Sequence, residues 1–197
     1  SRSDLSLLYR LLNSSRDSIG TVSSKGGNFY IQVLKPARYH FSADSNISDR
    51  KNTIVLGFEE KDQRDAAMAI IVSNAFFWFW RCHGNGVQIR TKELEAFPWP
   101  TKSVDVLSGI GRELSSMSDE ENFQVRSSNM GNFSSPAFRV VDQIRDADRA
   151  ITEALLGDGV DYSHFFESTR HPDATFSIAP SLSASGENVR TTPKAER

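Results

Sequence analysis

Six polar side chains that form hydrogen bonds gather within twelve residues, around two glycines. They are Arg81, His83, Asn85, Gln88, Arg90 and Lys92. Arginine, asparagine, glutamine and lysine are the side chains that read the edges of DNA bases or grip phosphates. Glycines at 84 and 86 would let the backbone amides approach a polyanion closely. On residue types alone, the segment is either a nucleic-acid contact or a solvated polar turn.

The sequence does not predict nucleotide binding, a metal site or a catalytic nucleophile. There is no Gly-x-x-x-x-Gly-Lys-Ser phosphate loop, no Gly-x-Gly-x-x-Gly fingerprint and no Gly-x-Ser-x-Gly nucleophile elbow. The four histidines stand singly, and none has a ligand partner at helical spacing, so no metal site is expected. Cys82 adjoins His83, but adjacent residues on a helix do not face one another, and we expect a buried, unreactive thiol. No catalytic residue and no metal ligand is therefore assigned.

A buried helix and a proline-rich stop should hold the polar segment. The apolar residues over 62–80 cover nearly the full circumference of a helix, which predicts one central, buried helix that ends in five aromatics. A glycine turn over 83–87 should end it, and residues 88–90 could form a short strand. Thr91 is expected to cap a short helix, which Phe97-Pro-Trp-Pro ends. The polar residues would then sit on a rigid platform.

The residues before the central helix predict a small sheet. Apolar residues at helical spacing predict a helix over 5–12. Residues 29–34 and 53–58 are rich in β-branched and aromatic side chains and predict two strands, with a polar loop over 42–52 between them. The strands should pair in an antiparallel sheet, and the central helix should pack across it, because a helix this apolar must be covered on most sides.

The residues after the proline-rich stop predict helices and a loop. A polar helix is expected over 104–117, an amphipathic helix over 137–156, and a serine-, asparagine- and acid-rich loop over 115–135. The predicted fold class is α+β: a small antiparallel sheet with a central buried helix, followed by C-terminal helices. The chain is expected to divide into an N-terminal helix and connector (1–20), a core (21–102), a helical C-terminal part (103–167) and a flexible tail (168–197).

The net charge of −2 hides an uneven distribution. Residues 25–102 carry eleven Lys and Arg against eight Asp and Glu, whereas residues 103–197 carry nine against fifteen. A mildly basic middle would bind a polyanion locally, although an ordinary mixed surface also fits. A single cysteine excludes an intrachain disulfide and suits a reducing compartment. Because neither a signal peptide nor a membrane-spanning run is recognisable, we expect a cytoplasmic protein.

The segment 73–98 resembles the C-terminal target-recognition (TaqI-like specificity) domain of adenine-specific DNA methyltransferases, which include type IIG restriction–modification enzymes. Those proteins carry an Asn-Ser-Ser-Leu-Phe-Tyr-Trp-Tyr-like helix, a glycine-containing turn and a Lys-x-x-(Asp/Glu)-(Ile/Leu)-x-x-Phe-Pro segment. Here Asn-Ala replaces the commoner Ser-Ser pair at 74–75. Upstream, Lys25-Gly-Gly-Asn-Phe-Tyr, Lys35-Pro-Ala-Arg-Tyr and Ser48-Asp-Arg-Lys-Asn-Thr-Ile are similar to three further family segments, in the same order.

The resemblance implies a module that grips a DNA duplex and reads its sequence. In that family a catalytic half flips an adenine and methylates its exocyclic amine. That half carries an Asn-Pro-Pro-Tyr tetrapeptide and a glycine-rich loop for S-adenosylmethionine, and neither string occurs in this chain. The chain itself is therefore expected to bind no cofactor and to transfer no methyl group, while S-adenosylmethionine is implied for the parent enzyme. The implied partners are double-stranded DNA and the parent's methyltransferase domain, without a membrane.

The resemblance also divides the candidate contacts into two sets. Base readers are expected among Arg81, His83, Asn85, Gln88, Arg90 and Lys92. Phosphate contacts are expected in turns that flank the strands, from Lys25, Lys35, Arg38, Arg50 and Lys51.

The alternative is a non-enzymatic protein-interaction or scaffold domain. In that interpretation the aromatic helix is only core, and the acidic C-terminal half docks a partner. A recognition domain should show clustered Lys and Arg beside the glycine turn, whereas a scaffold should show an exposed apolar patch.

Overall fold

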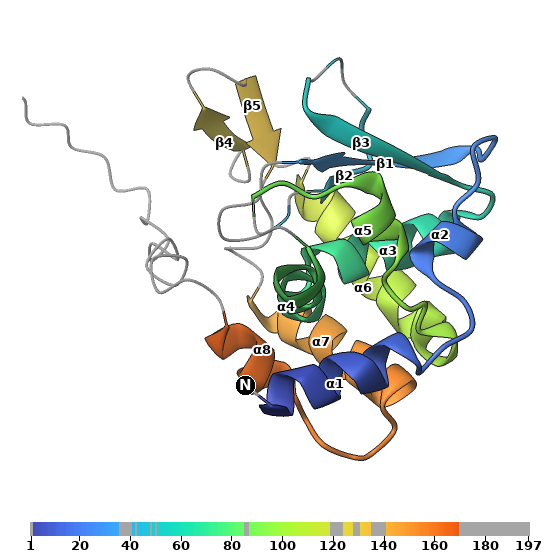
Figure 1. Cartoon of the computed structure of the whole chain (residues 1–197). Coiled ribbons are helices and arrows are strands. Elements are labelled where there is room, and N and C mark those ends of the chain that lie inside the picture. Colours follow the sequence, from blue (N-terminus) through green and yellow to red (C-terminus); the bar gives the residue numbers. More distant parts are fainter. Residues whose placement is uncertain are drawn as a thin grey trace, which may run out of the picture.

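The computed structural model describes residues 2–35, 41, 43–47, 49, 51–84, 87–118, 124–127, 131–134 and 141–169. Their fold is α+β, as the sequence predicts, and the helices lie on one side of a three-stranded sheet (Figure 1). The elements are α1 (Arg2–Leu12), α2 (Ile19–Val22), β1 (Phe29–Leu34), β2 (Ala43–Asp44), β3 (Thr53–Phe58), α3 (Lys61–Val72), α4 (Asn74–His83), α5 (Thr91–Glu95), the 3₁₀ turn η1 (Thr101–Ser103), α6 (Val104–Ser118), β4 (Gln124–Ser127), β5 (Gly131–Ser134), α7 (Val141–Leu155) and α8 (Ser163–Ser168).

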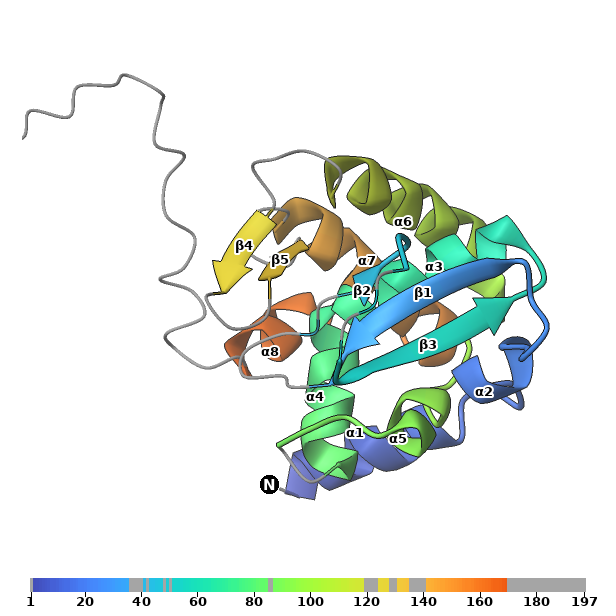
Figure 2. The ribbon, with the colours of Figure 1, turned by 90° about the horizontal axis from the view of Figure 1, so that it is seen from above.

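The sheet has the strand order β2-β1-β3, and both pairings are antiparallel. Phe29 pairs with Phe58 and Leu34 with Thr53, so β1 and β3 match over their full length (Figure 2). Both strands begin and end where the sequence predicts. The short strand β2 lies in the segment expected to be a loop, because two residues are too few for a recognisable pattern.

The central helix is divided in two, so the prediction of a single helix over 62–80 is wrong. Ser73 has an extended backbone (φ −67°, ψ 157°) that separates α3 from α4. Its hydroxyl donates to the carbonyl of Ile70 (2.6 Å) and accepts from the N–H of Phe76 (3.0 Å). One serine thus satisfies groups at the end of one helix and at the start of the next. The predicted burial is confirmed, since residues 65–80 are all buried.

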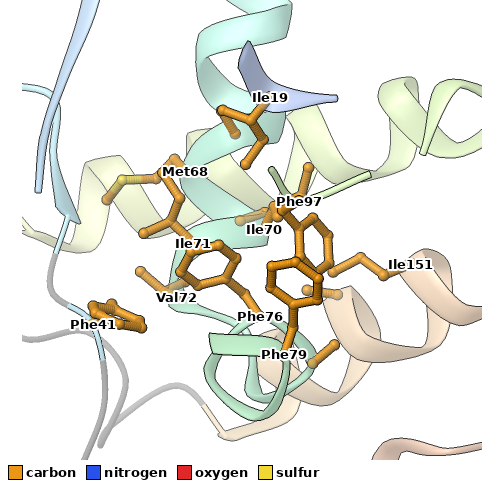
Figure 3. Packing of buried hydrophobic residues seen from close by; sticks show 14 of the residues in the cluster. Ile19, Phe41, Met68, Ile70, Ile71, Val72, Phe76, Phe79, Phe97 and Ile151 are labelled. Carbon is orange, nitrogen blue, oxygen red and sulfur yellow. The ribbon is translucent and has the colours of Figure 1, made fainter. Parts of the chain in front are cut away.

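The aromatic residues of α4 form the centre of the core. Phe76 and Phe79 lie edge-on to Phe97, with ring centroids 5.3 and 5.1 Å apart, and Figure 3 shows these three rings beside Ile151. Phe41 packs edge-on against Phe76 from the other side. Because α4 is covered by α3, α5, α7 and α8, its five consecutive aromatics are core residues first.

A glycine sets the closest approach between helices. A side chain at position 111 on α6 would collide with the backbone of Asp65 on α3, and these two helices make the most extensive helix–helix contact of the described residues. The helix predicted over 104–117 is present as α6. It was expected to be polar, but its inner side is apolar and buried at Leu107 and Leu114.

The C-terminal part departs from expectation between its helices. The predicted loop over 115–135 is wrong, because 115–118 belong to α6 and the strands β4 and β5 form an antiparallel hairpin. The amphipathic helix is present as α7, and residues 137–140 of the predicted range lie outside the described residues. The sequence did not predict α8. Residues 170–197 also lie outside the described part, so the flexible tail stays a prediction.

Two polar contacts attach the terminal helices. The buried carboxylate of Asp148 on α7 accepts from the Asn74 side-chain amide and from the Ala75 N–H at the start of α4, both at 2.8 Å. At the surface, the Arg10 guanidinium on α1 pairs with Asp158 at 2.7 Å. Within the described ranges, no helix has the length and apolar composition that crossing a membrane requires.

Candidate nucleic-acid interface

The segment 87–90 runs alongside the end of β1. The Ile89 N–H donates to the carbonyl oxygen of Lys35 at 3.0 Å, and the Ile89 side chain is buried. Alternate residues of an extended chain face opposite sides, so this burial directs Gln88 and Arg90 outward together. Both are exposed, as a contact surface requires. The prediction of a strand over 88–90 is wrong, because these residues belong to no strand, although the Ile89 N–H bonds to the backbone at the end of β1.

The C-terminal end of α4 changes from buried to exposed within one residue. Trp80 is 1% exposed, whereas Arg81, Cys82 and His83 are exposed. Cys82 is thus not the buried thiol that we expected. The ring of His83 stacks on Phe79, with centroids 5.2 Å apart, which holds the imidazole against the helix.

Gly84, which follows the last residue of α4, lies too close to Trp80 to carry a side chain. Its N–H donates to the Trp80 carbonyl at 2.6 Å, and a Cβ at this position would lie 2.8 Å from the Trp80 indole nitrogen. Its φ of −97° is open to any residue, so close approach rather than backbone conformation requires glycine here. The chain consequently leaves α4 tightly against the indole.

Two depressions adjoin on this face. One, of about 400 Å³, is lined among the described residues by Lys35, Gln88, Ile89, Arg90 and Thr91. The other, of about 380 Å³, is lined by His83, Gly84, Arg90, Lys92 and Glu93. Arg90 lines both. Residues far apart in sequence thus share one concave, cation-rich face, which we call the Arg90 face; its candidate contacts are Lys35, His83, Gln88, Arg90 and Lys92.

The other phosphate candidates divide between the two ends of the sheet. The Lys35 N–H donates to the carbonyl of Asn52 at 2.8 Å, so Lys51 lies at the same end as Lys35. Lys25 lies at the opposite end, because the neighbouring Ser24 N–H bonds to the carbonyl of Gly57. The structure therefore brings Lys51, but not Lys25, towards the Arg90 face.

The remaining candidates lie away from the Arg90 face or outside the described residues. Arg81 is exposed on the last turn of α4 and lines neither depression. Asn85, Arg38 and Arg50 lie outside the described residues. Their roles as base reader and phosphate contacts stay predictions.

A buried glutamate, which the sequence analysis did not single out, supports the Arg90 face from beneath. Glu93 is 5% exposed, and its Oε2 accepts from the Trp80 indole N–H (3.2 Å) and from the Arg90 backbone N–H (3.1 Å). The second bond makes Arg90 the N-cap of α5, so our assignment of Thr91 as the cap is wrong by one residue. Glutamate at the third helical position is the sequence signal that identifies this cap.

The described residues of the Arg90 face do not form a metal site. Within the part of the chain that the structure describes, no three His, Cys, Asp or Glu side chains converge where a metal ion could be held. The arrangement of exposed Arg90 and Lys92, half-buried Lys35 and the Gln88 amide on a concave surface is suited to anionic and hydrogen-bonding ligands.

Comparisons with known proteins give no match. No model of a protein family fits the chain, and neither the curated proteins nor the solved structures contain a match to it. A function for this chain therefore has to be argued from the Arg90 face and from the motifs of the sequence.

Proposed function

We propose that this chain is the DNA target-recognition module of a type II adenine-N6 DNA methyltransferase whose catalytic site lies on another part of the parent protein. The observation that carries the proposal is the Arg90 face, where Lys35, Arg90 and Lys92 meet beside the Gly84 turn. This clustering is what distinguishes a recognition domain from a scaffold in the sequence analysis. S-adenosylmethionine belongs to the parent enzyme in this proposal.

The proposed role of each side chain follows from the element on which it lies. Lys35, at the end of a paired strand, and Lys51 at the same end grip phosphates, which positions the duplex without reading it. Gln88 and Arg90 flank the buried anchor Ile89 and are held on a rigid extended segment. Glutamine pairs with adenine and arginine with guanine in the major groove, so these two are the proposed base readers.

The first test is the salt dependence of DNA binding by the isolated chain. A surplus of only three positive charges over 25–102 implies weak binding to any duplex, lost steeply as salt rises, because bound counterions are released from the phosphates. Fluorescence anisotropy of a labelled duplex at several salt concentrations measures this slope. Binding that is insensitive to salt contradicts the proposal.

Matched lysine variants then locate the interface. Lys35→Ala should weaken binding to every duplex similarly and lower the salt slope by about one. Lys25→Ala removes the same charge at the opposite end of the sheet and should change affinity much less. Equal effects of the two variants would mean that the charge of the whole domain, and not the Arg90 face, attracts DNA.

A second candidate function is a protein-interaction domain, favoured by the outer side of α1. Leu5, Tyr9 and Leu12 are 67%, 71% and 38% exposed, and their spacing places them in one apolar stripe along the helix. Such a stripe is suited to a protein partner, and the parent's methyltransferase domain is the partner that the first proposal supplies. Replacing Leu5 and Tyr9 by serine should leave DNA affinity unchanged if the Arg90 face alone binds the duplex.

A further inference from the structure

Glu93 is almost fully buried, although it lies at the edge of the proposed binding face. Its side chain is 6% exposed, whereas the Arg90 side chain beside it is 56% exposed. Removing a carboxylate from water is costly unless hydrogen bonds or charges compensate. Here the Trp80 indole N–H and the Arg90 backbone N–H donate to Oε2, while Oε1 lies 3.7 Å from Nε of the Arg90 guanidinium.

These contacts hold Arg90 at two points. The backbone N–H bond fixes where the side chain begins, and the ion pair engages the inner nitrogen of the guanidinium. Among the described residues, no partner engages the two terminal nitrogens of Arg90, and the side chain lines both depressions. Because the carboxylate lies nearest Nε, at 3.7 Å, the outer N–H groups stay available to a ligand that accepts two parallel hydrogen bonds.

We propose that Arg90 reads guanine and that Glu93 is the residue that positions it; the inference rests on the proposed function. The terminal nitrogens of Arg90 donate to O6 and N7 of a guanine in the major groove, which is the pattern that arginine matches bidentately. Glu93 acts through Arg90 and does not touch DNA. By limiting the rotamers of a long side chain before binding, it reduces the entropy that Arg90 loses in the complex.

The experiment compares a short guanine–cytosine duplex with the same duplex in which 7-deazaguanine replaces guanine. The substitution removes the N7 acceptor and leaves the phosphate charge and the base pairing unchanged. The wild-type chain should bind the guanine duplex about tenfold more tightly, the value of one hydrogen bond from a charged donor. Anisotropy titrations of both duplexes at one salt concentration give this ratio.

Glu93→Gln tests the positioning role. The glutamine oxygen still accepts from the backbone and the indole, so the cap of α5 persists, but the charge opposite the guanidinium is lost. The guanine preference should fall to about twofold, with overall affinity nearly retained. Glu95→Gln is the matched control, since it removes the same charge from the same helix and should keep the tenfold preference.

Arg90→Lys provides an independent variant that leaves Glu93 intact. Lysine keeps the charge but not the planar fork, so salt-dependent binding should remain and the guanine preference should fall clearly below that of the wild type. Near-ultraviolet circular dichroism confirms that each variant is folded, because Trp80 reports on its contact with Glu93.

Each failure has a separate meaning. If the wild type binds neither duplex in a salt-dependent way, the proposed function is wrong and this inference with it. If it binds both duplexes equally, DNA binding stands but Arg90 does not read guanine. If Glu93→Gln keeps the tenfold preference, Glu93 only caps α5, and the positioning role is overturned.

Discussion

Both ends of α4 carry polar residues, but those at the N-terminal end are buried and those at the C-terminal end are exposed. At the N-terminal end, Ser73 and Asn74 are 1% and 2% exposed, and the buried carboxylate of Asp148 lies against the first turn. At the C-terminal end, Arg81 and His83 are exposed. An anion at the helix N-terminus and the Arg81 cation in the last turn both complement the helix dipole.

The difference shows how polar residues of one helix divide between stability and function. At the buried end, hydrogen bonds to Asp148 and Ser73 bind α4 to α7 and to α3, and no ligand can reach them. At the exposed end, Arg81 and His83 meet solvent, and the His83 ring stacks on Phe79. We therefore expect substitutions at the buried end to change the free energy of unfolding, and, under the proposed function, a substitution of His83 on the Arg90 face to change DNA affinity.

Asp148→Ala should have the largest effect on stability. It leaves the Ala75 N–H and the Asn74 amide buried without their acceptor, which should lower the free energy of unfolding by about 3 kcal/mol. Urea denaturation followed by circular dichroism measures the loss. Asp142→Ala is the control, because this residue of the same helix is 91% exposed and should cost at most about 0.5 kcal/mol. Similar losses in both would remove the distinction between the two ends.

Trp80→Phe should have the next largest effect, because Trp80 joins the buried helix to the exposed face. Losing the indole N–H bond to Glu93 should cost about 1 kcal/mol more than the same change at Trp78. Trp78 packs on Phe165 and Phe166, so Trp78→Phe controls for the smaller ring. Urea denaturation of the two variants side by side gives the difference, and no difference would mean that the indole bond adds nothing.

Arg90→Ala should separate stability from binding. The ion pair with Glu93 is half exposed on the arginine side, so the free energy of unfolding should change by about 0.5 kcal/mol or less. In the parent methyltransferase that the proposed function implies, the variant should cost about 1–3 kcal/mol at the cognate site and relax discrimination at one base pair. Methylation of near-cognate duplexes measures this, and an even loss of activity at all sites would show that Arg90 is structural.

Asp158→Asn should have the smallest effect and should appear only in acid. Hydrogen bonds from the Arg10 guanidinium and then from the Val160 N–H lower the pKa of Asp158 from 3.8 to about 2. This stabilisation is complete above pH 3.8 and is lost as the pH falls towards about 2. The variant should therefore lose less stability over that interval than the wild type, as measured by urea midpoints. Arg10→Gln should reproduce the effect, and an unchanged acid slope in both variants would contradict it.

Several features of the fold could be read from local patterns. The two paired strands and the buried stretch of 65–80 were predictable, because β-branched and aromatic residues favour strands and an unbroken apolar run indicates burial. The break at Ser73 was not, since serine is tolerated inside a helix and also caps one. Its extended conformation separates two helices with different neighbours, since α3 packs against the sheet and α6, whereas α4 packs against α5 and α8. The hairpin of β4 and β5 had too weak a pattern to predict.

What the sequence by itself determined about this protein is the α+β class, the aromatic core helix and the candidate contacts after it, because these depend on residue type and short spacing. Only the tertiary structure decided which candidates share a surface. The antiparallel sheet brings Lys35 beside Ile89, and the fold places Asp148 on Ala75, across separations that carry no distance information in the chain. It also revealed Glu93 beneath Arg90, since burial depends on what packs around α5 as a whole.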